Sequence, residues 1–314
     1  MIKLLSYKTP KNKKITEQVL KLISDTFGIE EEILERRQLF GDEKDKNIDY
    51  LFTALEDKKL IGTIHLTVTK SNHYFGCLGG MVIAPEARGK GIASILFNNA
   101  CSYFDKLGGK CLFLGTSNPI ASKLYEKYDF KFLSGTSIMV RTTENSYFDF
   151  LKSIYTNQNY KIVKIDDSSR IPIIPLIASR CRDILMDSNC NIVNSLYATQ
   201  NSCTGLYPRF LNLSNYGNSY VAKLDNQGII AILTEKIINN THNIDCFSYK
   251  GYENILQELL KQTLENNVKY SAIIAKEDYD KQKLFESFNF KIIKEYDFNF
   301  NKIHIPCYYY ELDK

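Results

Sequence analysis

The sequence predicts an α+β protein made of two similar domains in tandem. The chain has 314 residues, whereas single domains usually have about 100–200. Strand-like and helix-like segments alternate along it, and the order of these segments in the first half returns in the second. Hydrophobic residues make up 44% of the chain and charged residues 24%, which is typical of folded, water-soluble domains.

In the first half, the spacing of apolar residues changes repeatedly between the period of a strand and that of a helix. A hairpin is expected where two strand-like runs join at Asp57 and Lys58, and a helix is expected to end at Gly108 and Gly109, a pair typical of a C-terminal cap. Strands are expected at 2–7, 49–57, 59–70, 74–83 and 110–116, with strand-like residues at 130–142, and helices at 15–27, 31–40, 91–109 and 118–129.

The second half repeats this order. The segment KLYEKYDFK, which begins at Lys123, matches KLFESFNFK from Lys283 at five of nine positions. We interpret the chain as an internal duplication, with chance similarity between short helices as the alternative. This predicts a domain at residues 1–145, a linker at 146–158 and a second domain at 159–314. In the second domain, strands are expected at 160–165, 220–225, 228–237, 243–249 and 269–275, a helix at 252–268, and a helical region at 170–186 like that of the first domain.

Charge and cysteine usage exclude several classes of protein. The net charge of +4 is small and evenly spread, so no nucleic-acid partner is expected. Residues 1–25 lack the uninterrupted apolar run of a secretory signal, and no segment approaches the ~18 apolar residues of a membrane span. The eight cysteines are scattered without a CxxC pair. This pattern predicts reduced, mostly buried thiols in a cytoplasmic protein, with no disulfide, no metal site and no membrane partner.

The stretch APEARGKGIAS at residues 84–94 joins a strand to a helix through glycines and basic residues. The first turn of a helix leaves four backbone N–H groups unpaired at the positive end of its dipole. Gly89 and Gly91 let a ligand approach this backbone closely, and Arg88 and Lys90 add positive charge. These features predict a phosphate-binding loop, with a basic turn before an ordinary helix as the alternative.

Two common phosphate-binding loops do not fit this stretch. A P-loop needs Ser or Thr after its Gly-Lys pair, and Gly91 follows Lys90 here. A dinucleotide-binding fingerprint would use Gly89 and Gly91 but meets Ser94 where its third glycine belongs. It also requires parallel strands where a hairpin is expected, so the loop is of another kind.

The loop resembles that of the Gcn5-related N-acetyltransferase (GNAT) superfamily, whose motif is Arg/Gln-x-x-Gly-x-Gly/Ala. Arg88, Gly91 and Ala93 match this motif in full. In place of the glycine of the family's second motif stands Asp129, a mild departure because Asp tolerates a left-handed turn. The resemblance covers about residues 1–145. The other positions of that second motif, an Asn followed by Ala and by Leu-Tyr-x-x-x-Gly-Phe, are met by Asn118, Ala121, Leu124, Tyr125 and Phe130.

The resemblance implies, in each domain, a mixed, mostly antiparallel twisted sheet flanked by helices, and in the first domain a site for acetyl-CoA. In that family the loop amides hold the pyrophosphate, and the preceding strand splays from its neighbour to bind the pantetheine arm. Tyr125 is expected to be the general acid that protonates the leaving thiolate, since a phenol with a pKa near 10 is protonated at neutral pH; a packed aromatic residue is the alternative. The cofactor-binding residues implied are Met81, Val82, Ile83, Arg88, Gly89, Lys90, Gly91, Ile92, Ala93, Ser94, Asn118, Ala121 and Tyr125.

The sequence leaves the general base open. The amine must lose a proton before it attacks, and family members often carry a Glu or His on the strand before the loop, where only Cys77 is titratable here. His65, His73 and Glu56 are expected to be structural or surface residues, and a water relay or an amine of low pKa would also serve. A solvated helical face is preferred over attraction of a cationic amine for the acidic run of Glu30, Glu31, Glu32 and Glu35.

The second half lacks the loop. The segment SYKGYEN before the expected helix has one glycine and no Arg-x-x-Gly-x-Gly, and Phe285 replaces the tyrosine. We therefore expect a degenerate C-terminal domain without a CoA site, in an N-acetyltransferase whose acceptor, a primary amine, attacks directly through a tetrahedral intermediate. The acceptor stays open among aminoglycoside-like drugs, amino acids, polyamines, peptides and protein termini, and so does the oligomeric state. The competing hypothesis is a non-catalytic acyl-CoA-binding or sensing module.

Overall fold

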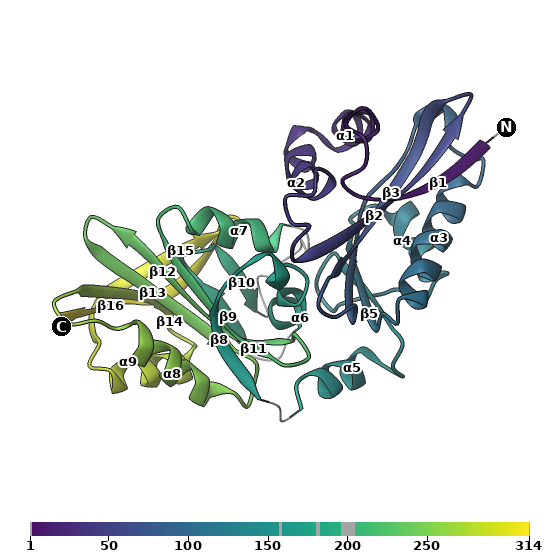
Figure 1. Ribbon diagram of the computed structural model, residues 1–314. Coiled ribbons are helices and arrows are strands. Elements are labelled where there is room, and N and C mark those ends of the chain that lie inside the picture. Colours follow the sequence, from purple (N-terminus) through teal and green to yellow (C-terminus); the bar gives the residue numbers. More distant parts are fainter. Residues whose placement is uncertain (1, 157–158, 180–182, 196–204, 314) are drawn as a thin grey trace. The chain divides into compact units, whose positions relative to one another are not determined.

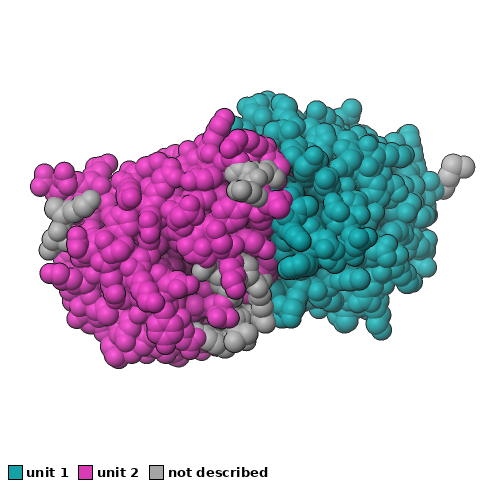
Figure 2. Space-filling model, turned by 90° about the horizontal axis from the view of Figure 1, so that it is seen from below, with its two compact units in different colours: residues 1–154, 202–205 teal, residues 155–201, 206–314 magenta. Residues whose placement is uncertain are grey.

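The computed structural model describes residues 2–156, 159–179, 183–195 and 205–313 (Figure 1). The chain divides into two compact units, one of residues 1–154 with 202–205 and the other of residues 155–201 with 206–314 (Figure 2). Each unit contains a mixed seven-stranded sheet flanked by helices, so the expected fold class is confirmed. Among the described helices, none is long and apolar enough to cross a membrane.

The sheet of the N-terminal unit has the strand order β1-β2-β3-β4-β5-β7-β6. All neighbouring strands are antiparallel except β4 and β5, which are parallel. The hairpin between β2 and β3 turns at Asp57 and Lys58, both with positive φ, as the sequence predicts. The strands are β1 (Ile2–Lys8), β2 (Asn47–Glu56), β3 (Lys59–Thr69), β4 (Phe75–Ile83), β5 (Cys111–Gly115), β6 (Lys131–Phe132) and β7 (Ile138–Thr142).

Helices cover both faces of this sheet (Figure 1). Because side chains alternate along a strand, Phe52 packs with α3 on one face while its neighbour Leu51 packs with α1 on the other. Within the expected linker, residues 147–154 form a helix. The helices are α1 (Lys13–Phe27), α2 (Ile29–Leu39), α3 (Ile92–Lys106), α4 (Pro119–Glu126) and α5 (Tyr147–Ile154), with a short 3-10 turn at Pro85–Ala87.

The C-terminal unit repeats this topology. Its sheet, read from β8, has the order β8-β11-β12-β13-β14-β16-β15, and β13 and β14 form the parallel pair. Asp129 and Asn289, which are equivalent in the repeated segment, both have left-handed backbones with φ of 65° and 69°. The shared strand order and the shared turn support the internal duplication. The strands are β8 (Tyr160–Lys164), β11 (Gly217–Leu224), β12 (Ile229–Ile238), β13 (Thr241–Ser248), β14 (Lys269–Ala275), β15 (Lys291–Phe300) and β16 (Ile303–Asp313), and the helices are α6 (Ile173–Ala178), α7 (Leu206–Leu213), α8 (Glu253–Thr263) and α9 (Tyr279–Ser287).

The expected helical region at 170–186 is only partly correct. Residues 173–178 form α6, but Ile184–Asp187 form strand β9, which pairs with β10 (Ile192–Ser195) in a separate two-stranded sheet. A short apolar run fits a buried strand as well as a helix, so periodicity alone could not separate the two. The N-terminal unit has α1 and α2 at the corresponding place between its first two strands.

Candidate functional site

The loop between β4 and α3 is open at its backbone. Gly89 and Gly91 have left-handed φ values of 76° and 75°, and a Cβ added at either would meet no atom within 4 Å. Gly91 is the N-cap of α3 and provides no side-chain cap. The first helical hydrogen bond runs from the N–H of Ile95 to the carbonyl of Gly91 (3.2 Å). The N–H groups of Ile92, Ala93 and Ser94 precede that bond, so the helix presents them to whatever occupies the space beside the loop.

Two cations flank this loop with weak attachments. The Nε of Arg88 donates to the carbonyl of Ile83 (3.2 Å), and the Nζ of Lys90 lies 3.3 Å from a carboxylate oxygen of Glu56. Both contacts are at the surface, where an ion pair contributes at most about 1 kcal/mol. Either side chain can therefore turn toward an anion at little cost.

The strand leading into the loop has an unpaired edge. Strand β4 pairs with β5 only from Phe75 to Cys77, and beyond this point it pairs with β3 alone among the described strands. Val82 is buried against α1. Met81 and Ile83 are half-buried and pack at the border of the apolar cluster between α3 and the sheet. The backbone of residues 78–83 is thus open to a ligand on the side facing away from β3.

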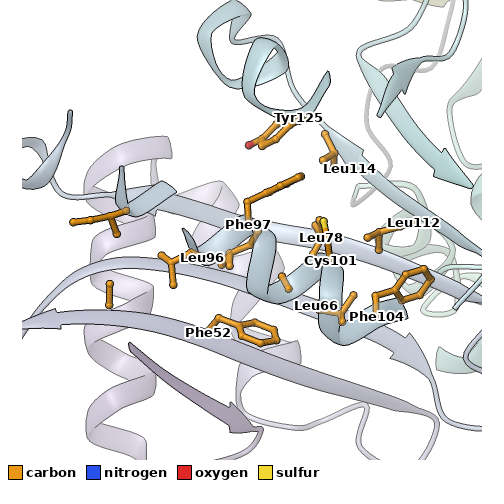
Figure 3. Close-up of a cluster of buried hydrophobic side chains, with 14 of the residues drawn as sticks. Phe52, Leu66, Leu78, Leu96, Phe97, Cys101, Phe104, Leu112, Leu114 and Tyr125 are labelled. Carbon is orange, nitrogen blue, oxygen red and sulfur yellow. The ribbon is translucent and has the colours of Figure 1, made fainter. Parts of the chain in front are cut away.

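Tyr125 is held beside this helix by ring stacking. Its ring stacks on that of Phe97 with centroids 4.6 Å apart and planes inclined by 22°, and both belong to the apolar cluster between α3 and the sheet (Figure 3). Phe97 lies six residues after Gly91, roughly 9 Å along the helix axis. Burial raises the pKa of Tyr125 to about 12.

The start of α4 is fixed by the residue that the sequence predicts as its cap. The side-chain oxygen of Asn118 accepts from the N–H groups of Ile120 (2.9 Å) and Ala121 (3.4 Å), and the methyl of Ala121 packs against the core cluster. At the other end of α4, the hydroxyl of Tyr128 donates to the carbonyl of Ser94 (3.1 Å). This bond joins the residues that follow α4 to the first turn of α3, next to the loop.

The opposite face of β4 carries a pair that the sequence did not single out. Glu35 on α2 forms an ion pair with the Nε2 of His65 on β3, and their side chains are 1% and 3% exposed. The preferred interpretation of the acidic run as a solvated face is therefore wrong for Glu35. Glu32 pairs with Arg36, and the side chain of Glu31 lies outside the described residues. The two adjacent glycines on β4, Gly79 and Gly80, were the signal that something else fills this space.

The corresponding place in the C-terminal unit differs in each of these features. The first residue of α8 is Glu253, whose carboxylate accepts from the N–H of Gly251 (3.0 Å), so the chain's own anion already lies at this helix end. Phe285, at the position of the tyrosine, is fully buried. A cavity of about 540 Å³ lies between β13, α8 and α9, but it lacks both the glycine loop and the hydroxyl.

The point where β13 and β14 part is covered by the turn between β9 and β10. The backbone N–H of Ser188 donates to Asp245 (2.8 Å) on β13, and Asn189 exchanges hydrogen bonds of 2.9 and 2.8 Å with Asn243. Lys281 on α9 donates to the carbonyl of Met186 and to Asp245, both at 2.8 Å. These bonds hold the turn where the N-terminal unit leaves its strand edge open.

Comparison with known proteins places the N-terminal unit in a family. Residues 16–130 match the model of the Acetyltransferase (GNAT) family, and no curated protein matches the sequence. The resemblance predicted from the two motifs is thus confirmed for this stretch, which forms a GNAT domain. Among solved structures the chain is similar to a GNAT-family acetyltransferase from Staphylococcus aureus Mu50 (16% identity over 46% of this chain and 100% of that chain, TM-score 0.36), and to an acyl-CoA N-acyltransferase from Pseudomonas aeruginosa (17%, 45% and 97%, TM-score 0.36).

Proposed function

We propose that this GNAT acyltransferase domain transfers an acetyl group from acetyl-CoA to a primary amine. The observation that carries the proposal is the continuity of an unpaired strand edge, on β4, with an uncapped helix N-terminus, on α3. A ligand that uses both needs an amide-bearing chain at one end and a strong anion at the other, and acetyl-CoA has this form. In this proposal the site lies within residues 1–145, and the second domain, residues 159–314, has no CoA site.

The loop fits the pyrophosphate. The space beside Gly89 and Gly91 is empty of protein atoms to 4 Å, so phosphate oxygens can reach the N–H groups of residues 92–94 without moving the chain. Arg88 and Lys90 can supply charge-assisted hydrogen bonds, which are roughly twice as strong as neutral ones. The pantetheine amides would pair with the backbone of Met81, Val82 and Ile83 in the manner of an added strand.

Tyr125 has the chemistry of the general acid. Because its pKa is raised to about 12, the phenol stays protonated at neutral pH and can donate its proton to the sulfur as the C–S bond breaks. The thiol of Cys77 is buried on β4, and an acyl-enzyme through it would require the strand to open. Direct attack by the amine on the thioester is therefore the reaction we propose.

A test begins with binding. We expect acetyl-CoA to bind the full-length protein in calorimetry and to release free thiol when a suitable amine is added from a panel of aminoglycosides, amino acids, polyamines and peptides. Failure of acetyl-CoA to bind would refute the proposal. Binding without thiol release by any amine would instead support the second candidate, an acyl-CoA-binding or sensing module, which is favoured by the lack of a Glu or His on β4 itself.

A further inference from the structure

Strand β4 is irregular where its edge opens. Val82 pairs with Thr63 and Gly79 with His65, so Gly80 and Met81 together stand opposite Ile64 alone. This is a β-bulge, and Gly80 adopts the left-handed φ of 54° within it. Bulges beside active sites commonly redirect the strand, and this one includes Met81, the first of the residues proposed to bind pantetheine.

Glu35 and His65 occupy the space that side chains on this part of β4 would need. A Cβ at position 79 would clash with the Nε2 of His65 and would lie 2.8 Å from the Oε1 of Glu35. The other carboxylate oxygen, Oε2, pairs with the Nε2 of His65. The carboxylate is therefore oriented by the imidazole through one oxygen and faces the glycine backbone of β4 with the other.

Burial of this pair is costly. The carboxylate of Glu35 is 1% exposed, and the described residues offer it no second ion pair. Removing a charged carboxylate from water costs several kcal/mol, and an apolar pair of similar volume is often equally or more stable than a buried polar pair. A buried pair beside an open strand edge is thus better explained by chemistry than by stability.

The two faces of the sheet then carry different groups. Tyr125 belongs to the cluster on the α3 face, whereas Glu35 and His65 lie on the face covered by α1 and α2 (Figure 1). The open edge of β4 runs between these faces. An amine at this open edge would therefore have the acid on one side, toward α3, and the carboxylate on the other, toward α1 and α2.

We infer that Glu35 is the catalytic base and that His65 is its positioning residue, an assignment that rests on the proposed function. The lone pair of the amine forms the C–N bond to the acetyl carbon, and the C–S bond breaks. The proton lost by the amine passes to Oε1 of Glu35, and the sulfur takes the proton of the Tyr125 hydroxyl. Solvent then reprotonates Tyr125 and deprotonates Glu35, so atoms and charge balance over the cycle.

Substitution tests the base directly. For Glu35→Gln we expect acetyl transfer to fall roughly 10²- to 10⁴-fold, with the calorimetric affinity for acetyl-CoA unchanged and a cooperative unfolding transition retained. His65→Gln should lower kcat by a smaller factor without changing that affinity. The matched control is Glu43→Gln, which alters another buried, ion-paired carboxylate nearby in the sequence and should retain full activity. Full activity of Glu35→Gln would overturn the inference.

A second measurement needs neither an acceptor nor a variant. The chain has four histidines, so the imidazole nitrogen signals of His65 can be resolved by ¹⁵N NMR in complexes with CoA and with acetyl-CoA, which differ only in the acetyl group. We expect the His65 signals to differ between the two complexes and those of His304 to be identical. Identical His65 signals would refute the inference while leaving the proposed function intact. Absence of acetyl-CoA binding would refute the proposed function itself.

Discussion

Replacing Gly91 by alanine has two separate effects that can be measured: one on stability, through the left-handed backbone of the loop, and one on the proposed binding of acetyl-CoA. At a φ of 75°, an L-residue costs about 1–2 kcal/mol. The added Cβ meets no atom within 4 Å, so no packing clash adds to this cost. For a domain of about 150 residues, 1 kcal/mol corresponds to about 2–4 °C in melting temperature, so this cost lowers the melting temperature by about 2–8 °C. We expect Gly91→Ala to fold, with a decrease of this size.

Gly91→Ala should weaken acetyl-CoA binding by more free energy than it removes from folding stability. The new methyl group stands beside the N–H groups of the first turn of α3, in the space that phosphate oxygens need. Hydrogen bonds to a charged group contribute about 1.5–3 kcal/mol each, so the loss of one corresponds to roughly ten- to hundredfold weaker binding. Isothermal titration calorimetry with acetyl-CoA measures this change, and thermal unfolding of the ligand-free protein measures the other.

The same helix supplies the control. Gly108 follows the C-terminal end of α3, also has a φ of 75°, and also has no atom within 4 Å of an added Cβ. Gly108→Ala should therefore lower the melting temperature as much as Gly91→Ala but leave acetyl-CoA binding unchanged. If Gly91→Ala binds acetyl-CoA like the wild type, or if both variants bind equally poorly, the loop does not hold the phosphates.

Three further changes probe other parts of the molecule. Tyr125→Phe keeps the ring stacked on Phe97 and should lower acetyl transfer roughly 10²- to 10⁴-fold at unchanged acetyl-CoA affinity; unchanged turnover would show that the acid is another group. Burial, with the nearby charge of Asp245, raises the pKa of Asp187 to about 7, above its unfolded value of about 3.9. Between about pH 3.9 and pH 7 the carboxyl of Asp187 is protonated in the folded state and ionised in the unfolded state. The free energy of unfolding is therefore greatest at low pH and falls as the pH rises toward 7, by at most about 1.4 kcal/mol per pH unit. Asp187→Asn should abolish this slope in urea unfolding between pH 5 and 8, and a wild type without the slope would contradict the assignment. Lys281→Met leaves Asp245 buried without its cation and should destabilise the chain by about 3–5 kcal/mol, seen as a lower urea midpoint; an unchanged midpoint would show that the pair contributes nothing.

Features encoded in contiguous residues could be predicted from the sequence. The turn at Asp57 and Lys58, the Asn118 cap and the glycine loop each depend on local backbone chemistry, and the structure has all three in the expected conformation. The equivalence of Asp129 and Asn289 was also visible, because the repeated segment keeps a residue that tolerates a left-handed turn at both positions.

Contacts that depend on strand register could not be predicted from the sequence. Glu35 and His65 are thirty positions apart and meet because α2 lies against β3, beside a bulge that shifts the pairing of β3 with β4. Nothing in the spacing of apolar residues reveals that shift. The β9–β10 hairpin was missed for another reason: Ile184–Asp187 form a short apolar run whose partner strand is equally short.

The turn that covers the separation of β13 and β14 has a consequence for the stability of the two units in a cell. In each unit two parallel neighbouring strands separate, β4 from β5 and β13 from β14, and the space between them has to be filled by part of the protein or by a ligand. In the second copy the turn after β9 occupies this place through hydrogen bonds of its own, which act whether or not a solute is bound. If the first copy binds a metabolite there, it gains about 2.7 kcal/mol when that metabolite is present at a hundred times its Kd. Starvation for that metabolite would then expose only one half of the molecule to unfolding and degradation.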